Sequence, residues 1–486
     1  MDTPLEDLAA HAHGTHVVVI GAGIGGLVAA LACAKVGMRV TVLEASGRTG
    51  GAIRTEEIAG VRADLGAEGY ATRGGAVRAL VDELGLTDAV VATAPRAEWI
   101  SGLPEGAAPV PPESLRGIPQ YPFEEGVRRM IGWRGAWRAY VDRIRPPLTI
   151  GQERSLGRLV RSRMGELVLD RIVAPLSLGG FAIHPDDVDV EVVAPGLNAA
   201  LTNTGSLTGA VSQLRAGPRP AGPALETLDG GMTGLVDALV ERLTALGAEI
   251  RLRTAADRIE PIEDGRWHVR VDHAATGDEA EVEIADAVII ATGGEQAQRL
   301  LAARVPSLEP TPLVELEVLT LVVDAGELRA APPRTAVYPV AGTAVAASVT
   351  DSTARWPWMT APPGTAVLKV TFGGPGVVPA TADLDDQAAA ELALAEASAL
   401  LDVPLERVRL RGFQRARWSQ PPPVSALGHR ETSESARSAI HDIPGLAVVG
   451  AWIAGTGLAQ VVPDALAEAE RVKRDALWGG VADASF

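Results

Sequence analysis

Short apolar runs that are typical of buried strands alternate along this chain with glycine turns and with segments of helical spacing. The first run, residues 17–20, is entirely β-branched, as expected of a strand covered on both faces. Apolar residues recur at helical spacing through 27–36, and a second strand-like run follows at 40–43. The order predicts a strand, a glycine turn, a helix and a parallel strand.

The turn between the first strand and the helix carries glycines with separate physical roles. Gly21 permits the tight turn, Gly23 lets the backbone approach a pyrophosphate, and Gly26 lets the helix pack against the sheet. The helix N-terminus offers N–H groups to phosphates, and Glu44 at the end of the second strand can accept both ribose hydroxyls. We therefore predict a dinucleotide site formed by Gly21, Ala22, Gly23, Ile24, Gly25, Gly26, Glu44 and Ala45.

NAD and FAD both fit such a unit, so the residues that follow Glu44 have to distinguish them. Arg48, Gly50 and Gly51 come next and resemble an extension found in flavoproteins of the amine oxidase superfamily, where it runs along the FAD pyrophosphate. Dehydrogenases that use only NAD generally lack this extension. The resemblance therefore favours FAD as the cofactor.

Further strand and glycine signals lie far downstream, as in a discontinuous Rossmann-type domain. Strand-like runs at 249–252, 267–271, 287–290 and 446–449 are interspersed with helical segments. A final helix, expected from about Pro463, would direct its N-terminal N–H groups at the flavin pyrimidine, where negative charge builds on reduction. The residues expected to touch the flavin there are Gly450, Thr456, Gly457 and Leu458.

Beyond the nucleotide motif, the chain resembles the protoporphyrinogen and coproporphyrinogen oxidases, most closely the actinobacterial coproporphyrinogen-oxidising group. The segments that carry the resemblance are 51–55, 63–68, 83–86, 170–176, 355–358, 416–418 and 428–429, within a match over residues 16–475. By this resemblance the residues in contact with FAD also include Gly66, Ala67, Glu68, Gly69, Ala256 and Trp418.

The resemblance also implies an activity: oxidation of coproporphyrinogen III or protoporphyrinogen IX in heme biosynthesis, with O2 as acceptor and H2O2 as product. Because the flavin performs the chemistry, the protein mainly positions the substrate, and no catalytic residue is assigned. Arginine recognises carboxylates well, and by the family resemblance Arg96 is the leading candidate for the substrate carboxylates and Arg73 the second.

The departures from the family pattern lie on the substrate side. Ala52, Gly74 and the stretches 181–184 and 421–424 replace residues that the relatives usually carry. Two alternatives therefore stay open. One is a paralogous flavin oxidase that acts on a different amine or electron-rich substrate, and the other is a redox-silent flavin mutase or isomerase.

The length of 486 residues exceeds what one core usually supports, so several domains are expected. We predict an α/β fold with a discontinuous Rossmann-type FAD-binding domain, an inserted mixed-sheet substrate domain and a helical subdomain. The predicted ranges are 14–75, 225–300 and 410–475 for the FAD-binding domain, 76–224 for the helical subdomain and 301–409 for the mixed sheet.

Charge and composition narrow the set of partners. A net charge of −17 makes nucleic acid an unfavourable partner, and it means that an anionic substrate needs a local basic pocket. The single Cys33 excludes an intramolecular disulfide and suits a reducing, cytoplasmic location. The 8 histidines show no metal-ligand spacing, and no metal is expected. We find no transmembrane segment, while a peripheral membrane contact stays open.

Overall fold

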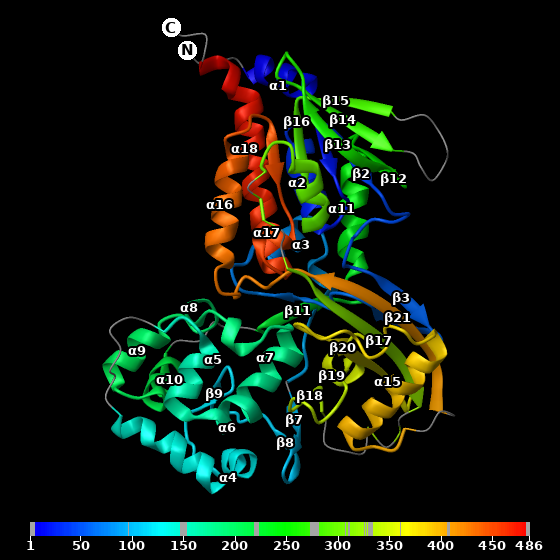
Figure 1. The fold of residues 1–486 in the computed structure, drawn as a ribbon. Coiled ribbons are helices and arrows are strands. Elements are labelled where there is room, and N and C mark those ends of the chain that lie inside the picture. The colour runs from blue at the N-terminus through cyan, green and yellow to red at the C-terminus, as the bar shows by residue number, and fades with distance from the viewer. Residues whose placement is uncertain are drawn as a thin grey trace.

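A five-stranded parallel sheet forms the centre of the upper half of the molecule (Figure 1). The computed structural model describes residues 5–95, 97–145, 153–217, 223–272, 281–306, 308–309, 312–324, 326, 328, 334–359, 361–405 and 409–482. The sheet has the order β12-β2-β1-β16-β22, with every neighbouring pair parallel. Its strands are β1 (His16–Ile20), β2 (Arg39–Glu44), β12 (Glu249–Leu252), β16 (Ala287–Ile290) and β22 (Leu446–Val448).

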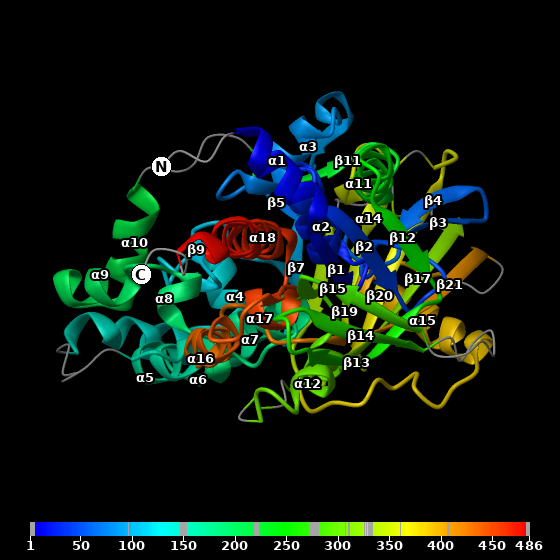
Figure 2. The ribbon, with the colours of Figure 1, turned by 90° about the horizontal axis from the view of Figure 1, so that it is seen from above.

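Both faces of this sheet are covered, which explains why its strands are apolar throughout. In β1 the buried residues Val17 and Val19 face one core, and Val18 and Ile20 face another. The first core lies under α2 (Ile24–Ala34), α11 (Thr233–Ala245) and α18 (Leu458–Ala482). Helix α18 lies alongside α2 in both views (Figures 1 and 2). The second core lies under α12 (Gly294–Leu301), α16 (His429–His441) and the antiparallel strands β13 (Ala255–Pro261), β14 (Trp267–Asp272) and β15 (Glu281–Ala285).

A seven-stranded mixed sheet forms the lower right part of Figure 1, with the order β21-β17-β20-β19-β18-β7-β8. Only the β18–β7 pair is parallel among these strands. Helix α15 (Asp386–Leu401) packs on one face. The strands are β7 (Glu98–Leu103), β8 (Gly106–Pro109), β17 (Val314–Asp324), β18 (Ala336–Pro339), β19 (Ala346–Asp351), β20 (Thr365–Gly373) and β21 (Leu410–Gln420).

The lower left part is a group of helices around its own apolar core (Figure 1). Its first helix, α4 (Glu125–Tyr140), is interrupted at Gly132, whose φ of 69° lies outside the helical range. The other helices are α5 (Leu156–Met164), α6 (Glu166–Val168), α7 (Ala174–Phe181), α8 (Val190–Val193), α9 (Leu197–Thr204) and α10 (Leu207–Ala216).

Smaller elements connect these three parts. They are α1 (Leu5–Gly14), β3 (Thr55–Ile58), β4 (Val61–Asp64), β5 (Tyr70–Ala71), α3 (Ala76–Glu83), β6 (Val90–Ala92), β9 (Ser114–Leu115), β10 (Ile118–Pro119), β11 (Leu225–Leu228), α14 (Ser352–Arg355) and α17 (Ala451–Ala454), with short 3-10 helices at η1 (Thr87–Ala89), η2 (Val141–Ile144) and η4 (Pro185–Asp187) and a π-helix at η3 (Leu169–Val173). Among the described helices, none combines the length and the apolarity needed to cross a membrane.

The α/β fold class is confirmed, but the sheet does not respect the predicted ranges everywhere. Strands β7 and β8 come from the range predicted as helical, and β21 comes from a range predicted for the FAD-binding domain, yet all three lie in the seven-stranded sheet. Strand pairing is a long-range contact, so a boundary drawn from local patterns cannot locate it. The remaining domain boundaries stay predictions.

Candidate active site

A cavity of about 860 Å³ lies between the parallel sheet and the mixed sheet. One wall is rich in glycine and comes from the parallel-sheet half, including Gly23, Gly66 and Gly457. The opposite wall comes from α7 and the mixed sheet, including Phe181 and Val318. The cavity therefore joins the predicted nucleotide site to the predicted substrate domain.

The N-terminus of α2 opens on this cavity. Gly23 is the N-cap residue in an extended conformation, and within the described part of the chain no side chain caps the helix. A Cβ added to Gly23 would meet no atom within 4 Å, so the N–H groups of the first turn face open space. A Cβ on Gly26, in contrast, would lie 2.0 Å from the Gly21 carbonyl oxygen. This arrangement fits a phosphate at a helix N-terminus.

The side chains predicted for the ribose and pyrophosphate are held by backbone groups. The Glu44 carboxylate accepts hydrogen bonds from the N–H of Ala22 and the N–H of Ser46, both at 2.8 Å. Arg48 donates to the carbonyl of Gly51 at 2.9 Å and to that of Ile53 at 3.3 Å. Glu44 thus stays at the end of β2, and Arg48 stabilises the glycine turn.

Three segments meet at Gly66, at the centre of the glycine-rich wall. A Cβ there would lie 1.9 Å from the Ala52 carbonyl oxygen and 3.3 Å from the Cη2 atom of Trp418. The N–H of Ala67 donates to the same Ala52 carbonyl at 3.1 Å. Only glycine fits this position, and the half-buried Trp418 closes that side of the cavity.

Glu68 is the centre of a polar cluster that we call the Glu68 cluster: Glu68, Ser352, Arg355, Trp356 and Lys369. The Lys369 Nζ lies 2.9 Å from one carboxylate oxygen, and Ser352 donates to the same oxygen at 2.6 Å. The Trp356 indole donates to the other oxygen at 3.1 Å, and Arg355 lies 3.8 Å from it. The cluster ties the glycine-rich wall to the mixed sheet.

Burial of Glu68 acts to raise the pKa of its carboxyl, but its neighbours outweigh burial. Lys369, then Arg355, and then the hydrogen bonds from Ser352 and Trp356 lower this pKa to about 2. Glu68 is therefore ionised at every physiological pH.

The predicted cofactor residues divide into two groups by position. The cavity is lined by Gly23, Ile24, Gly25, Gly50, Gly66, Ala67, Glu68, Gly69, Trp418, Gly450, Thr456, Gly457 and Leu458. The residues that do not line this cavity are Gly21, Ala22, Gly26, Glu44, Ala45, Arg48, Gly51 and Ala256. The buried Ala256 accepts a hydrogen bond from the Gln296 side chain at 3.1 Å. Contact of any of these residues with FAD stays a prediction.

Only one of the two arginines predicted to bind substrate lies in the described part of the chain. Arg96 lies outside the described residues. Arg73 is exposed and does not line the cavity, although it lies beside the side-chain amide of Gln460 in the first turn of α18. A role for either arginine in substrate binding stays a prediction.

Sequence reasoning missed the cations of the opposite wall, Arg355 and Lys369. A signal for Lys369 was present, because this lysine interrupts the apolar run 366–370 of a buried strand. Arg355 lies in a segment that carries the family resemblance, but nothing local indicates that its side chain reaches the cavity.

A family model described as flavin containing amine oxidoreductase matches residues 24–476. The chain belongs to this flavin amine oxidoreductase family. It is therefore a flavin-dependent oxidoreductase, and the recognition made from the sequence is confirmed.

Curated relatives match this chain over most of its length. The coproporphyrinogen III oxidases of Mycobacterium tuberculosis and Mycobacterium bovis are 30% identical to this chain over 452 residues, which cover 90% of this chain and 93% of theirs. The enzyme of the same name from Propionibacterium freudenreichii is 27% identical, covering 94% and 90%.

A solved structure from Exiguobacterium sp. 255-15, provisionally assigned as a protoporphyrinogen oxidase, has a TM-score of 0.82 at 23% identity and covers 95% of this chain and 99% of that one. At this identity the likeness shows a shared fold.

Proposed function

We propose that this protein is an FAD-dependent oxidase that converts coproporphyrinogen III to coproporphyrin III, with O2 as acceptor and H2O2 as product. The observation that carries the proposal is the match to curated coproporphyrinogen III oxidases over 90% of the chain at 30% identity. The net reaction removes six hydrogen atoms from one porphyrinogen and converts three O2 to three H2O2. Protoporphyrinogen IX is the second substrate to be tested.

The geometry of the cavity supports FAD as the flavin. Its glycine-rich wall begins at the N-terminus of α2 and continues past Gly50 and Gly66 to Gly457, at the start of α18. An elongated dinucleotide matches this course better than a single ring system would, and the uncapped helix N-terminus suits its phosphates. The chemistry that FAD supplies when bound is hydride acceptance followed by reoxidation.

The opposite wall supplies what a porphyrinogen requires from the protein itself. Apolar side chains of Leu178, Phe181 and Leu316 can pack on a macrocycle, and they exclude water from its reacting carbons. The cations of the same wall can bind carboxylates. These residues bind and orient the substrate, and we assign no proton acceptor.

The test is a direct assay of the purified yellow protein with coproporphyrinogen III and, in parallel, protoporphyrinogen IX. Growth of porphyrin fluorescence, with one peroxide formed per O2 consumed, supports the proposal and ranks the two substrates. A bound, reducible flavin that leaves both porphyrinogens unchanged would favour an oxidase of another substrate. Turnover of a substrate without any O2 consumption would favour a mutase.

We also propose a peripheral contact with an anionic membrane surface, made by an exposed aromatic patch on α4 and its flanks. We define the α4 patch as Tyr121, Phe123, Trp133, Trp137, Tyr140, Val141 and Ile144, all of them exposed, with Trp133 61% and Ile144 76% accessible. Phe123 and Trp137 stack edge to face, with ring centroids 5.1 Å apart. Aromatic side chains of this kind are typical of the membrane interface.

The local positive charge around the α4 patch favours an anionic membrane as its partner. Residues 121–145 contain six arginines and three acidic residues, in a chain whose net charge is −17. Arg128 lies over the Trp133 ring at 4.7 Å and Arg143 lies 5.8 Å from the Tyr140 ring centre. A surface that is both aromatic and locally cationic complements anionic lipid headgroups.

A further inference from the structure

The charges along the cavity are not balanced. Its charged lining residues, within the part of the chain that the structure describes, are Glu68, Glu295, Arg299, Arg355 and Lys369, so three cations face two carboxylates. The protein as a whole has a net charge of −17. The cavity therefore carries a local positive excess inside a negative molecule.

Two of the three cations have a close carboxylate of their own. Arg299 pairs with Glu295 at 3.2 Å on the exposed side of α12. Lys369 pairs with Glu68 at 2.9 Å, and its side chain is only 9% exposed. The Arg299 guanidinium and the Lys369 ammonium are each balanced by a carboxylate, so neither accounts for the positive excess of the cavity.

Arg355 carries the remaining charge. Its nearest carboxylate is Glu68 at 3.8 Å, which is already bound by Lys369, Ser352 and Trp356. The guanidinium lies 5.3 Å from the Trp356 ring centre, and its side chain is 30% exposed. The guanidinium of Arg355 therefore makes no close ion pair among the described residues, and it is only partly exposed to solvent.

The backbone that carries Arg355 is held from several sides. Arg355 is the last residue of α14, whose N-terminus is capped by the Asp351 side chain accepting from the N–H of Ala354 at 2.9 Å. The Arg355 carbonyl accepts from the N–H of Ala94 at 2.9 Å. A guanidinium on such a fixed base is pre-organised for bidentate recognition.

We propose that Arg355 binds a carboxylate of the substrate and so determines the preference of the cavity for an anionic macrocycle. This inference rests on the proposed function, because it takes the substrate to be a carboxylated porphyrinogen. The apolar Trp356 and Phe181 border the same cavity, so a flat ring and its acidic side chain can be held together.

Binding of a stable porphyrin tests the inference without turnover. The flavin-loaded protein is titrated with coproporphyrin III, which has free carboxylates, and with its tetramethyl ester, which has none. We expect the wild type to prefer the free acid, and Arg355→Gln to weaken binding of the free acid about ten- to hundredfold, with little change for the ester. Arg355→Lys should recover part of the affinity, because it keeps the charge but loses the fork.

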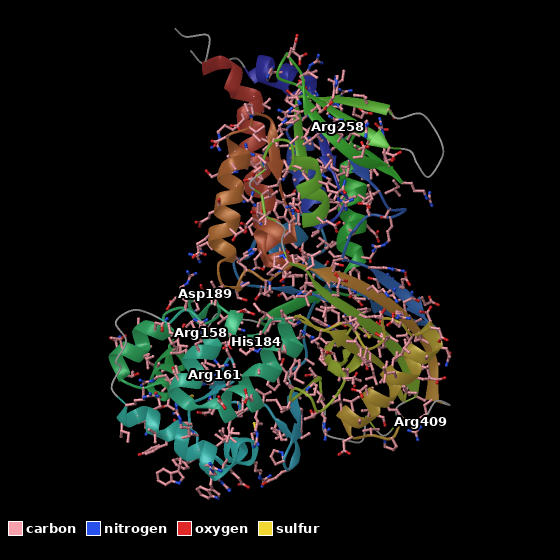
Figure 3. All side chains as sticks on the ribbon, viewed as in Figure 1. Arg158, Arg161, His184, Asp189, Arg258 and Arg409 are labelled. Atoms are coloured by element: carbon pink, nitrogen blue, oxygen red, sulfur yellow. The ribbon has the colours of Figure 1, made fainter. Side chains whose placement is uncertain are left out.

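Arg258→Gln is the matched control. This substitution removes the same charge as Arg355→Gln. Arg258, however, lies on β13 at the far end of the molecule from the mixed sheet (Figure 3) and pairs there with Glu260 at 2.6 Å. The Arg258→Gln protein should bind both porphyrins as the wild type does. Flavin content and the melting temperature are measured for every variant.

Two results would overturn the inference. One is equal affinity of the wild type for the acid and the ester, which needs no variant and is independent of folding. The other is an Arg355→Gln protein that retains its flavin and binds the free acid unchanged. The proposed function is judged separately, by oxidation of coproporphyrinogen III by the wild type, so that either conclusion can fail alone.

Discussion

Two glycines of the α2 turn, Gly23 and Gly26, serve different purposes at the scale of single residues. Gly26 is required by the fold, because its Cβ position is filled by the Gly21 carbonyl oxygen. At Gly23 the surroundings are open and φ is −71°, so the fold tolerates a side chain there. Only a ligand at the helix N-terminus would exclude one.

We therefore expect Gly23→Ala to fold almost normally, with a loss of less than about 1 kcal/mol in the apo-protein, but to retain little flavin. Gly26→Ala should lose both its flavin and part of its stability, with destabilisation of about 2 kcal/mol or more, since the backbone has to move. Flavin content by visible absorbance and urea unfolding of the apo-proteins measure the two effects. If Gly23→Ala kept its flavin, the phosphate would not approach this turn.

Lys369 and Glu68 illustrate how a nearly buried ion pair behaves when one partner is lost. Lys369→Met leaves the Glu68 carboxylate without its closest cation, so we expect a loss of about 3 kcal/mol in unfolding free energy. Adding Glu68→Gln should recover most of this loss, because the carboxylate that lost its partner is then replaced by a neutral amide. Denaturant unfolding of both single variants, the double variant and the wild type completes the cycle. Equal losses in Lys369→Met and in the double variant would contradict this account.

At the scale of elements, α16, β22 and α18 are joined by a network around Arg437. Arg437 donates to the Val448 carbonyl at 3.1 Å, lies 3.0 Å from Glu468 and is hydrogen-bonded to Asp464. The second Asp464 oxygen, Oδ2, is buried and has no hydrogen-bond partner among the described residues. Burial raises the pKa of Asp464 to about 6, although Arg437 acts in the opposite direction.

This raised pKa gives a pH dependence whose sign can be stated. Ionised Asp464 costs the folded state stability; the cost is absent below about pH 4, grows between about 4 and 6, and is complete above. Relative to the wild type, Asp464→Asn should therefore gain up to about 3 kcal/mol between pH 4 and pH 7. Thermal or urea unfolding over this range gives the difference. A difference that stays constant with pH would show that Asp464 has an ordinary pKa.

The start of helix α18 differs from the one predicted from the sequence. The helix was expected from about Pro463 onward, but it begins at Leu458 and contains Pro463 in its second turn. The expectation was wrong by about one turn. The proline removes one intrahelical N–H, which packing of α18 against α2 outweighs.

At the scale of the whole molecule, the helix α4 that carries the patch lies at the opposite end from α1 and from the last turns of α18 (Figure 1). If it binds anionic membranes, the wild type should sediment with vesicles containing phosphatidylglycerol and phosphatidylcholine, but not with phosphatidylcholine alone. Trp133→Ser with Trp137→Ser should reduce the bound fraction at least tenfold, and salt should weaken it.

The matched control for this experiment replaces exposed apolar residues elsewhere. Val345 and Val378 are 54% and 75% exposed and lie outside the patch, so Val345→Ser with Val378→Ser should sediment as the wild type does. Sedimentation that persists unchanged in the double tryptophan variant would exclude the patch as the contact surface.

The sequence by itself determined the half of this protein that is predicted to bind the dinucleotide. The turn at Gly21, Gly23 and Gly26, with Glu44 at the next strand end, depends on contacts between residues close in the chain, so their spacing is readable. The same holds for the buried strands β16 and β22, whose apolar runs at 287–290 and 446–449 were predicted as strands.

Only the tertiary structure decided the composition of the opposite wall. Arg355 and Lys369 reach the cavity because β20 and α14 pack against the loop that carries Glu68, which is about 300 residues earlier in the chain. No local pattern encodes such a contact, since strand pairing and ion pairing between distant segments depend on how whole elements pack. The cations that we propose to position a substrate therefore became visible only in the fold, whereas the residues predicted to bind a dinucleotide were already visible in the sequence.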